Sequence, residues 1–368
     1  MKKLIITHLT SAHPRYDTRI FVKECSSLAK VYKVNLIVAD GLGDEIKNGV
    51  HIYDIGRGEG RLSRIFSTTK RVLAKAIELE SDLYHMHDSE LIPVGLKLKK
   101  SGKKVVFDSH EDVPKELMGK PYLNKTLLKI LSMLFARYEK INLKKFDAMV
   151  TATPALREKF LLINTTVVDV NNFPIIEELS SSVSWKERED VVCYVGVISE
   201  SRGIKEMVRA FAYYSEAKLN LGGKFNQTAL KDEVMGYESW KNVNFLGYLS
   251  REEVASTLSR SKAGLVTLHD MPNYKDALPV KMFEYMVASL PVISSNNELW
   301  KRIIEKHQCG ICVDPMNPEE IAQAIRYIIE HPTEAKKMGE NGKQAVLEIY
   351  NWGQEKQKLL RLYEELLA

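Results

Sequence analysis

Short apolar runs rich in β-branched residues recur along the whole chain, and stretches with helical spacing separate them. Because these runs are apolar nearly throughout, they are typical of strands that are covered on both faces, as in parallel sheets. The sequence therefore predicts an α/β protein. The runs fall into two series, the first at 4–9, 34–40, 50–55, 83–87, 104–110, 148–153 and 167–173, the second at 191–197, 218–223, 243–248, 263–268, 291–295 and 309–314.

Two series of strands predict two doubly wound domains with parallel sheets, and a length of 368 residues agrees with two cores. The polar, serine-rich segment 176–190 is the expected linker, and residues 351–368 form a final amphipathic helix. In such folds ligands bind beyond the carboxyl ends of the strands. We therefore expect the functional residues in strand-to-helix loops and the main site in the cleft that the two domains face.

Composition and motifs argue against several classes of protein. No apolar run approaches the length of a membrane span, and the run after Met1 is shorter than the core of an export signal. Four cysteines in such a length fit the reducing conditions of the cytoplasm, where we expect the protein. No G-x-G-x-x-G and no Walker loop is present, which argues against a tightly held dinucleotide and against ATP hydrolysis.

The net charge of +5 is unevenly divided. Residues 1–180 carry 29 Lys and Arg against 22 Asp and Glu, whereas residues 181–368 carry 24 against 26. This excess is too small for a nucleic-acid-binding domain, so no nucleic-acid partner is expected. A long amphipathic helix predicted within 121–149 holds much of it. That helix suggests docking to an anionic membrane or a lipid-linked substrate, unless its basic face is simply solvated.

The segment 194–211 is a strand, a glycine turn at Gly196, a polar loop and a helix. Arg202 and Lys205 fall at or just inside the predicted start of that helix. Free N–H groups and the helix dipole favour an anion there, so two nearby cations suggest a phosphate site. The alternative is an ordinary solvated helix start.

A second loop of the same half repeats this arrangement. Pro279 suits the first position of a helix, which leaves the N–H groups of Val280 and Lys281 available to an anion. Glu284, one turn further on, could accept two hydrogen bonds from the adjacent hydroxyls of a ribose. The alternative is a surface pair between Lys281 and Glu284, which are three residues apart.

Two strand ends of the N-terminal half carry polar clusters. His110 follows the strand 104–110, where it could contact a sugar hydroxyl or steady a leaving group, although the cluster could equally be a helix cap. His85 and His87 lie on one face of a strand, with Asp88 next. Two histidines and a carboxylate can bind a metal ion, but the spacing shows no further ligand. Histidines at the end of a strand in a polar loop are the commoner arrangement.

The first strand-to-helix connection, 11–30, contains Asp17 and Arg19. A local ion pair that closes the turn is one expectation for these two residues. Because the connection lies at the functional edge of the first sheet, binding of the acceptor is the other.

Together these stretches resemble the retaining glycosyltransferases of family 4, which have the GT-B fold. The resemblance covers nearly the whole chain and is strongest from Val191 to Ile349, and the order of the motifs is specific. The matching segments are YVGVISESRG (194–203), VNFLGYLSREEV (243–254), YKDALPVKMFE (274–284) in the place of the family's E-x7-E motif, ASLPVISSN (288–296), DSHED (108–112) and VNNFP (170–174).

The resemblance implies an acceptor-binding Rossmann-like domain at 1–178 and a nucleotide-sugar-binding one at 179–350. It also implies that the helix 351–368 crosses back to the N-terminal domain. No metal or other cofactor is expected, since basic side chains and helix N-termini stabilise the leaving diphosphate in such enzymes. Retention is expected to follow from front-side attack through an oxocarbenium-like state.

Carried over by position, Glu284 would bind the ribose and Arg202 would replace the phosphate-binding lysine. His110 would lie near the donor sugar, and Asp276 would contact the sugar ring as the first acid of E-x7-E. This aspartate is one methylene shorter than the usual glutamate, so contacts to the sugar can differ. Val197 stands where the family has an arginine, which leaves Arg202, Lys205 and Lys281 to neutralise the diphosphate.

The expected function is transfer of a sugar from a UDP- or GDP-linked donor to a saccharide acceptor, which can be lipid-linked. Resemblance to bacterial polysaccharide-assembly members suggests synthesis of a surface glycan, in the cytoplasm or on the cytoplasmic face of the inner membrane. Two alternatives remain open. One is a nucleotide-sugar 2-epimerase of the same architecture, and the other is a non-catalytic subunit that binds a nucleotide sugar.

Overall fold

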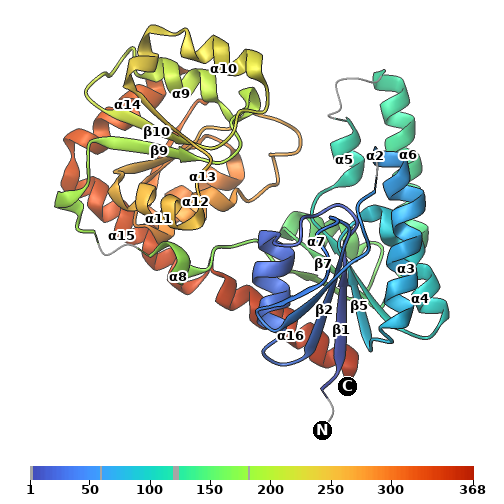
Figure 1. Cartoon of the computed structure of the whole chain (residues 1–368). Helices are drawn as coiled ribbons and strands as arrows, with labels where there is room; N and C mark the ends of the chain where they lie inside the picture. Colours follow the sequence, from blue (N-terminus) through green and yellow to red (C-terminus); the bar gives the residue numbers. More distant parts are fainter. Residues whose placement is uncertain (1–2, 59, 119–123, 181–182) are drawn as a thin grey trace. The chain divides into compact units, whose positions relative to one another are not determined.

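The computed structural model describes residues 3–58, 60–118, 124–180 and 183–368. The chain forms two compact units, one of Met1–Asn172 with Gly353–Ala368 and the other of Phe173–Trp352 (Figure 1). Each unit holds a largely parallel sheet that helices cover. This arrangement confirms the predicted α/β class with two doubly wound sheets.

The sheet of the N-terminal unit has the order β3-β4-β2-β1-β5-β6-β7-β8, and the strand order reverses beside β1. Every apolar run predicted for this unit forms one of its strands, whereas β3 was not predicted because the segment EIK is short and polar. β3 pairs with β4 in the antiparallel direction, and the other pairs are parallel. The strands are β1 (Ile5–Leu9), β2 (Lys33–Val38), β3 (Glu45–Lys47), β4 (Val50–Asp54), β5 (Leu83–Met86), β6 (Lys104–Ser109), β7 (Ala148–Thr151) and β8 (Val167–Asp169).

The sheet of the C-terminal unit is parallel, has the order β11-β10-β9-β12-β13-β14, and reverses beside β9. All six predicted runs of this half form its strands. They are β9 (Val191–Val195), β10 (Lys218–Gly222), β11 (Val243–Gly247), β12 (Ala263–Val266), β13 (Val292–Ser295) and β14 (Gly310–Val313).

Helices connect the parallel strands, and short helical turns, labelled η, precede or follow several of them. In the N-terminal unit they are η1 (Thr18–Cys25), α1 (Ser26–Leu28), α2 (Gly60–Ser63), η2 (Arg64–Thr68), α3 (Thr69–Glu78), η3 (Ser89–Leu91), α4 (Ile92–Lys100), α5 (Val113–Met118), α6 (Lys125–Asn142), η4 (Leu143–Lys145), α7 (Pro154–Leu161) and α16 (Trp352–Leu367). In the C-terminal unit they are α8 (Ile176–Leu179), η5 (Trp185–Glu187), η6 (Glu200–Arg202), α9 (Ile204–Ala210), α10 (Thr228–Met235), η7 (Glu238–Asn242), α11 (Arg251–Arg260), α12 (Val280–Val287), α13 (Glu298–His307), α14 (Pro318–Glu330) and α15 (Pro332–Glu348).

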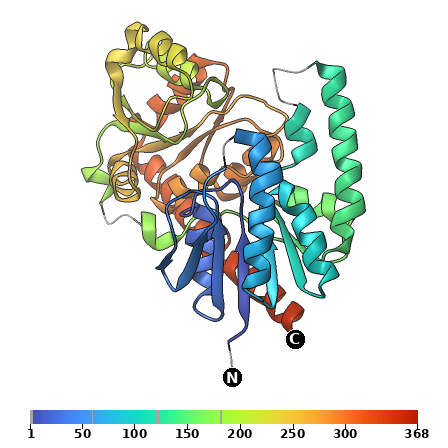
Figure 2. The same cartoon turned by 45° about the vertical axis from the view of Figure 1, so that its right-hand side comes forward.

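The two faces of the N-terminal sheet have different partners. Figures 1 and 2 show α3 and α4 on one face and α16 on the other. Leu9 and Met86 are fully buried among apolar side chains of α3 and α4. On the opposite face His8 and His85 approach Tyr363 of α16. Because side chains alternate along a strand, β1 and β5 thus bury an apolar face and a polar face.

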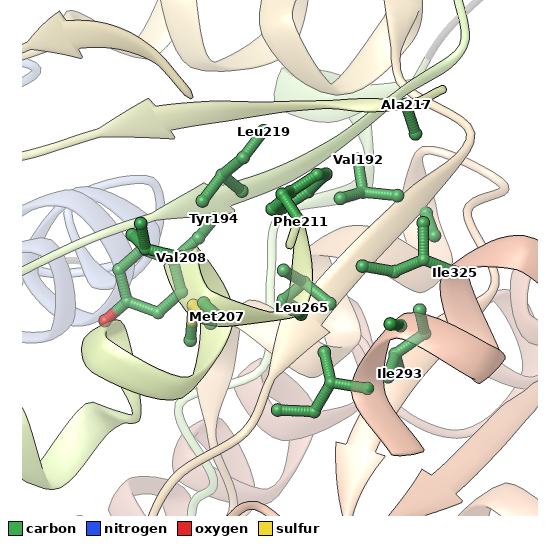
Figure 3. Packing of buried hydrophobic residues seen from close by; sticks show 14 of the residues in the cluster. Val192, Tyr194, Met207, Val208, Phe211, Ala217, Leu219, Leu265, Ile293 and Ile325 are labelled. Carbon is green, nitrogen blue, oxygen red and sulfur yellow. The ribbon is translucent and has the colours of Figure 1, made fainter. Parts of the chain in front are cut away.

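The core of the C-terminal unit lies between the sheet, α9 and α14. Figure 3 shows Val192 of β9, Leu265 of β12 and Ile325 of α14 pointing toward one another beside Phe211, and each is at most 1% exposed. Complete burial of an apolar side chain of this size contributes about 1.5–3 kcal/mol. This core holds the carboxyl ends of β9 and β12 in fixed positions.

The basic amphipathic helix is observed as α6, which Asn124 caps through a hydrogen bond from Thr126 N. Residues 121–123 of the predicted segment lie outside the described residues. α6 exposes apolar side chains, among them Met133 and Leu134 at 65% and 60%. None of the described helices is both long and apolar enough to cross a bilayer.

A glycine in β12 allows close packing against α12. A Cβ atom at Gly264 would lie 2.1 Å from the Tyr285 ring, which is almost fully buried. Gly264→Ala is therefore expected to lower the free energy of unfolding of this unit by about 1–3 kcal/mol through overpacking. Urea unfolding followed by tryptophan fluorescence measures this, because three of the four tryptophans lie within the C-terminal unit and Trp352 is its last residue.

The matched control is Gly236→Ala. Gly236 has φ −78°, and its nearest Cβ neighbour would be the Glu233 carbonyl oxygen at 3.3 Å. Here alanine should leave stability unchanged or raise it by up to about 1 kcal/mol. Equal stabilities of the two variants would contradict the role given to Gly264.

Candidate active site

Both sheets carry polar loops at the point where the strand order reverses. In the C-terminal unit, Gly196 directly follows β9 and Thr267 directly follows β12. In the N-terminal unit, Thr10 follows β1 and His87 follows β5. Because α/β sheets bind ligands beyond their carboxyl ends at such reversals, each unit has one candidate site at this edge of its own sheet.

Two cations meet at the backbone of Gly196. A Cβ atom at this position would lie 3.0 Å from Lys281 Nζ and 3.7 Å from Arg202 Nη1. Lys281 Nζ donates a hydrogen bond to the Tyr194 hydroxyl at 2.9 Å and lies 4.1 Å from the centre of that ring. Burial, with a smaller contribution from the charge of Arg202, lowers the pKa of Lys281 to about 7. A bound anion would offset the mutual repulsion of the two cations.

The loop that carries Arg202 is fixed by a second glycine. Gly203 has φ 76°, and a Cβ atom there would lie 2.1 Å from the Thr267 carbonyl oxygen. Only glycine tolerates both the left-handed conformation and so close a neighbour. The turn is thereby held against the end of β12, with Arg202 beside Tyr194 and Tyr274.

The start of α12 lies close to these cations. Pro279 was predicted as the first residue of this helix, but it is the N-cap, and the helix begins at Val280. The Pro279 carbonyl accepts a hydrogen bond from Met282 N at 3.0 Å. Val280 and Lys281 are the first residues of α12. Their N–H groups belong to the first turn, where no preceding helical carbonyl is available.

Glu284 lies one turn further along α12, and its side chain is 16% exposed. Its Oε1 accepts a hydrogen bond from Arg251 Nη1 at 2.8 Å, and Arg251 Nη2 donates to Glu178 at 2.9 Å. Lys281 points instead to Tyr194, and in the part of the chain that the structure describes Lys281 and Glu284 form no ion pair. Among the described residues Glu284 thus binds Arg251 and Lys281 binds Tyr194, in place of the surface pair considered above.

Lys205 is placed differently from Arg202. Its ammonium lies 3.1 Å from Glu200 and 2.9 Å from Glu233, and these hydrogen bonds raise its pKa. The charge of Lys205 is thus neutralised by two carboxylates at the surface, so the structure brings Arg202 and Lys281 together with Gly196 but leaves Lys205 outside this group.

Asp276 is half-buried in the segment between β12 and α12. Hydrogen bonds hold the backbone on both sides of it. Trp300 Nε1 donates to the Ala277 carbonyl at 2.7 Å, and Asn297 Nδ2 donates to the Lys275 carbonyl at 3.3 Å. The indole and the amide, both from the start of α13, therefore fix the path of the chain at Asp276.

A cavity of about 880 Å³ opens at the reversal point of the N-terminal sheet. It lies beyond the ends of β1, β5 and β6. Imidazole, guanidinium and carboxylate groups line it, including His13, Arg57, Arg64, Asp88, His110 and Glu111. Its volume is within the range of small-molecule sites.

His110 lies at the wall of this cavity and is held by a buried carboxylate. His110 Nε2 is 3.0 Å from Asp108 Oδ2, and His87 Nδ1 is 3.2 Å from the same oxygen. Asp108 is fully buried, whereas the His110 side chain is 20% exposed. Burial lowers the pKa of His87 to about 4, so this ring is neutral at physiological pH.

A second histidine of the cavity was not predicted. His13 Nδ1 lies 3.0 Å from Asp88 Oδ1, while Asp88 Oδ2 accepts hydrogen bonds from Thr10 Oγ1 and Ser11 N at 2.7 and 2.6 Å. Burial disfavours the charged imidazole, but the hydrogen bond and charge of Asp88 outweigh it and raise the pKa of His13. The only sequence signal was the position of Asp88 directly after a strand.

Arg19 and Asp17 do not form the local ion pair considered above. The Asp17 carboxylate caps η1 by accepting hydrogen bonds from Arg19 N and Ile20 N. The Arg19 guanidinium is buried and binds Asp108 through two bonds of 2.8 Å, and it donates to the Val170 carbonyl at 2.6 Å. Arg19 thus acts on His110 through Asp108.

Several residues of these sites had no recognisable signal in the sequence. Tyr194 looked like an ordinary strand residue, although its hydroxyl and ring hold Lys281. Arg251, which orients Glu284, lies 33 residues before it. Contacts of this kind depend on packing between elements rather than on local spacing.

Comparisons with known proteins agree with this geometry. A model of the family glycosyl transferases group 1 matches residues 175–345, which lie in the C-terminal unit. The D-rhamnosyltransferase WbpZ of Pseudomonas aeruginosa is 25% identical over 241 residues, which are 61% of this chain and 60% of that protein. The chain therefore spans about three fifths of the length of this curated relative.

Two solved structures share the fold over the whole chain. Sucrose-phosphate synthase from Thermosynechococcus elongatus has a TM-score of 0.77 at 19% identity and covers 100% of both chains. Anabaena Alr3699/HepE in complex with UDP-glucose has a TM-score of 0.75 at 14% identity and covers 98% of this chain and 100% of its own. The fold and the family match together support a glycosyltransferase of GT-B architecture.

Removal of the Asp108 charge should destabilise the N-terminal unit. In Asp108→Asn the buried Arg19 guanidinium loses its bidentate partner, and Glu24 remains 3.2 Å away. We expect a loss of about 3 kcal/mol, the low end for breaking a buried ion pair. Hydrogen exchange of β1 and β6, followed by mass spectrometry, measures the loss within this unit.

Glu78→Gln is the control, because Glu78 forms an ion pair with Lys75 while its side chain is 66% exposed. Its effect should stay below about 1 kcal/mol. Unchanged protection of β6 in Asp108→Asn would show that the buried pair is not a determinant of stability.

Proposed function

We propose that the protein is a retaining glycosyltransferase that moves a sugar from a nucleotide-sugar donor to a saccharide acceptor. One observation carries this proposal: Lys281 and Arg202 meet at Gly196, beyond the reversal point of the C-terminal sheet. This arrangement suits a diphosphate, because it combines two cations with the start of α12 and a backbone without a Cβ atom. The family match to this unit supports the same role.

In the proposed complex Lys281, Arg202 and the N–H groups at the start of α12 bind the diphosphate. Glu284 accepts hydrogen bonds from the ribose hydroxyls, and Arg251 holds its carboxylate in one orientation. Lys205 has no direct contact with the diphosphate in this proposal, because two carboxylates already bind and neutralise it. Asp276 contacts the donor sugar.

We infer a UDP- or GDP-linked donor. The Anabaena protein of the same fold was solved with UDP-glucose, and the Pseudomonas relative is a D-rhamnosyltransferase. Departure of the diphosphate develops negative charge beside Lys281 and Arg202, so fixed cations can stabilise the transition state without a metal ion at this site. Retention by front-side attack through an oxocarbenium-like state is part of the proposal.

The acceptor is assigned to the cavity of the N-terminal unit. His110 and His13 present imidazole groups to it, and Asp108 and Asp88 hold these rings. A saccharide offers many hydroxyl groups to such a polar wall. Arg19 would position His110 through Asp108 instead of contacting the acceptor, and Asp17 would set the start of η1.

A lipid-linked acceptor and contact with the cytoplasmic face of the inner membrane form part of this proposal. α6 exposes apolar side chains such as Met133 and Leu134, and the same helix carries Lys125, Lys129 and Lys140. Basic and apolar groups on one exposed helix favour an anionic membrane surface. We also propose a role in bacterial surface polysaccharide synthesis.

Nucleotide binding tests the donor site. In a thermal-shift panel of UDP, GDP, TDP and their sugars, one nucleotide should raise the melting temperature of the wild type. Glu284→Ala should lose most of that shift, because the ribose loses its acceptor. Glu298→Ala, an exposed change in α13, is the control and should keep it.

Equal shifts in the wild type and Glu284→Ala would refute the ribose assignment. Release of the nucleoside diphosphate only in the presence of an acceptor would separate transfer from epimerisation, which needs no acceptor. Binding without turnover of any acceptor mixture would favour a non-catalytic subunit.

Donor affinity should depend on pH through Lys281. Its pKa of about 7 in the free protein means that the ammonium is already charged below pH 7, so affinity is constant there. A bound diphosphate favours the charged form, so above pH 7 binding must take up a proton. Affinity for UDP-glucose, or for the preferred nucleotide sugar, should then fall by up to about tenfold per pH unit.

Isothermal titration between pH 6 and 8.5, in two buffers with different ionisation enthalpies, measures both the affinity and the proton uptake. At pH 6, Lys281→Met should bind the nucleotide sugar more weakly than the wild type does. At pH 8, its binding should take up no proton. A wild-type affinity that stays constant across this range would contradict the shifted pKa.

A further inference from the structure

Three histidines and a glutamate meet in the interior of the N-terminal unit, below the floor of the cavity. They are His8, His85, His87 and Glu24, and all four side chains have no solvent exposure. The proposed transfer reaction makes no direct use of this cluster. All four side chains, three imidazoles and one carboxylate, are of the kinds that bind metal ions in proteins.

The register of the sheet explains why the histidines meet. His8 of β1 pairs directly with His85 of β5, so both side chains lie on the same face. His87 is two residues beyond His85 and therefore also lies on that face. η1 covers the face and places Glu24 above the three rings.

The ligand atoms have nearly the separations that one metal ion requires. His8 Nδ1 and His87 Nε2 are 2.9 Å apart, and Glu24 Oε2 lies 3.8 to 4.0 Å from the nearest nitrogen of each histidine. One ligand atom from each residue lies within 4.8 Å of all the others. Ligand bonds of ~2.0–2.1 Å in a tetrahedron place neighbouring ligand atoms ~3.3 Å apart, so small side-chain rotations suffice.

We propose that His8, Glu24, His85 and His87 bind one divalent transition-metal ion of the zinc type. Imidazole nitrogens with one carboxylate are the donor set that such ions prefer. Four protein ligands leave no open position, which is typical of a structural site and not of a catalytic one. The ion would fix β1, β5 and η1 to one another, independently of the donor site of the C-terminal unit.

Unpartnered polar atoms provide an independent indication. Among the described residues, neither carboxylate oxygen of Glu24 has a hydrogen-bond partner. Arg19 Nε lies 3.2 Å from Glu24 Oε1, which leaves Oε2 directed to the histidines. Buried polar atoms without partners are costly, and a bound cation removes this cost.

The surroundings hold two rings from behind, as is usual at metal sites. His87 Nδ1 lies 3.2 Å from Asp108 Oδ2, so the Nε2 atom faces the cluster. His8 Nε2 lies 3.3 Å from the Tyr363 hydroxyl, so the Nδ1 atom of His8 also faces the cluster. His85 Nδ1 lies 2.6 Å from the same hydroxyl and must exchange this hydrogen bond for the metal ion.

A second group, His87, Asp108 and His110, is a weaker candidate. It has three ligands instead of four, and His110 is partly exposed at the cavity. Asp108 is already bound by both arms of Arg19, so its oxygens are less available to a cation. The two groups share His87 but use different nitrogens of its ring.

Metal content tests the proposal. The full-length protein, prepared without a polyhistidine tag, is dialysed against Zn²⁺ or Co²⁺ and then against metal-free buffer. We expect about one ion per chain by elemental analysis and, with Co²⁺, the intense visible absorption of a tetrahedral site. Chelation should lower the melting temperature, because the ion binds only the folded chain.

Two variants locate the ion. Glu24→Gln and His85→Gln should lose it and show no chelator effect, whereas His110→Gln should keep both the ion and the spectrum. A wild type that holds no ion after dialysis would overturn the proposal. Loss of the ion in His110→Gln but not in Glu24→Gln would also overturn it. If the core variants fail to fold, the wild-type stoichiometry and the comparison with His110→Gln decide.

Discussion

The N-terminal unit depends on one buried ion pair. Arg19 at the start of η1 binds Asp108 at the end of β6 through two hydrogen bonds, and its third arm reaches the carbonyl of Val170 beyond β8. Compared with apolar side chains, buried pairs of this kind contribute little net stability because both charges lose their hydration, although removal of one partner leaves a costly unpaired charge. Their effect here is positional, since Asp108 in turn holds His87 and His110 at the cavity.

The C-terminal unit uses its cations in the opposite way. Lys281 and Arg202 are packed against the phenol of Tyr194. Among the described residues, no carboxylate forms an ion pair with either of them. Lys205 lies in α9, directly after the loop that carries Arg202. In contrast to Arg202, it forms ion pairs with Glu200 and Glu233, which neutralise its charge. Two basic side chains held near one another without a counter-charge would be stabilised by an anion, and the donor site proposed above rests on this contrast between the two units.

The sequence predicted the sheets well because each strand is a short apolar run between helical stretches. β3 could not be found in this way, since its three residues are polar and its pairing is set by β4. The loop residues were located correctly at strand ends, but their partners were not. Arg19 and Asp108 are 89 residues apart, and Lys205 and Arg202 looked equivalent until packing separated them.

His87 connects the buried cluster to the cavity, because its two nitrogens face different neighbours. A metal ion on Nε2 forces the ring proton onto Nδ1, which then donates to Asp108 Oδ2. His110 Nε2 lies 3.0 Å from the same oxygen and 3.2 Å from His87 Nδ1. Asp108, which contacts both His87 and His110, would thus connect an ion in the interior with the imidazole at the wall of the cavity.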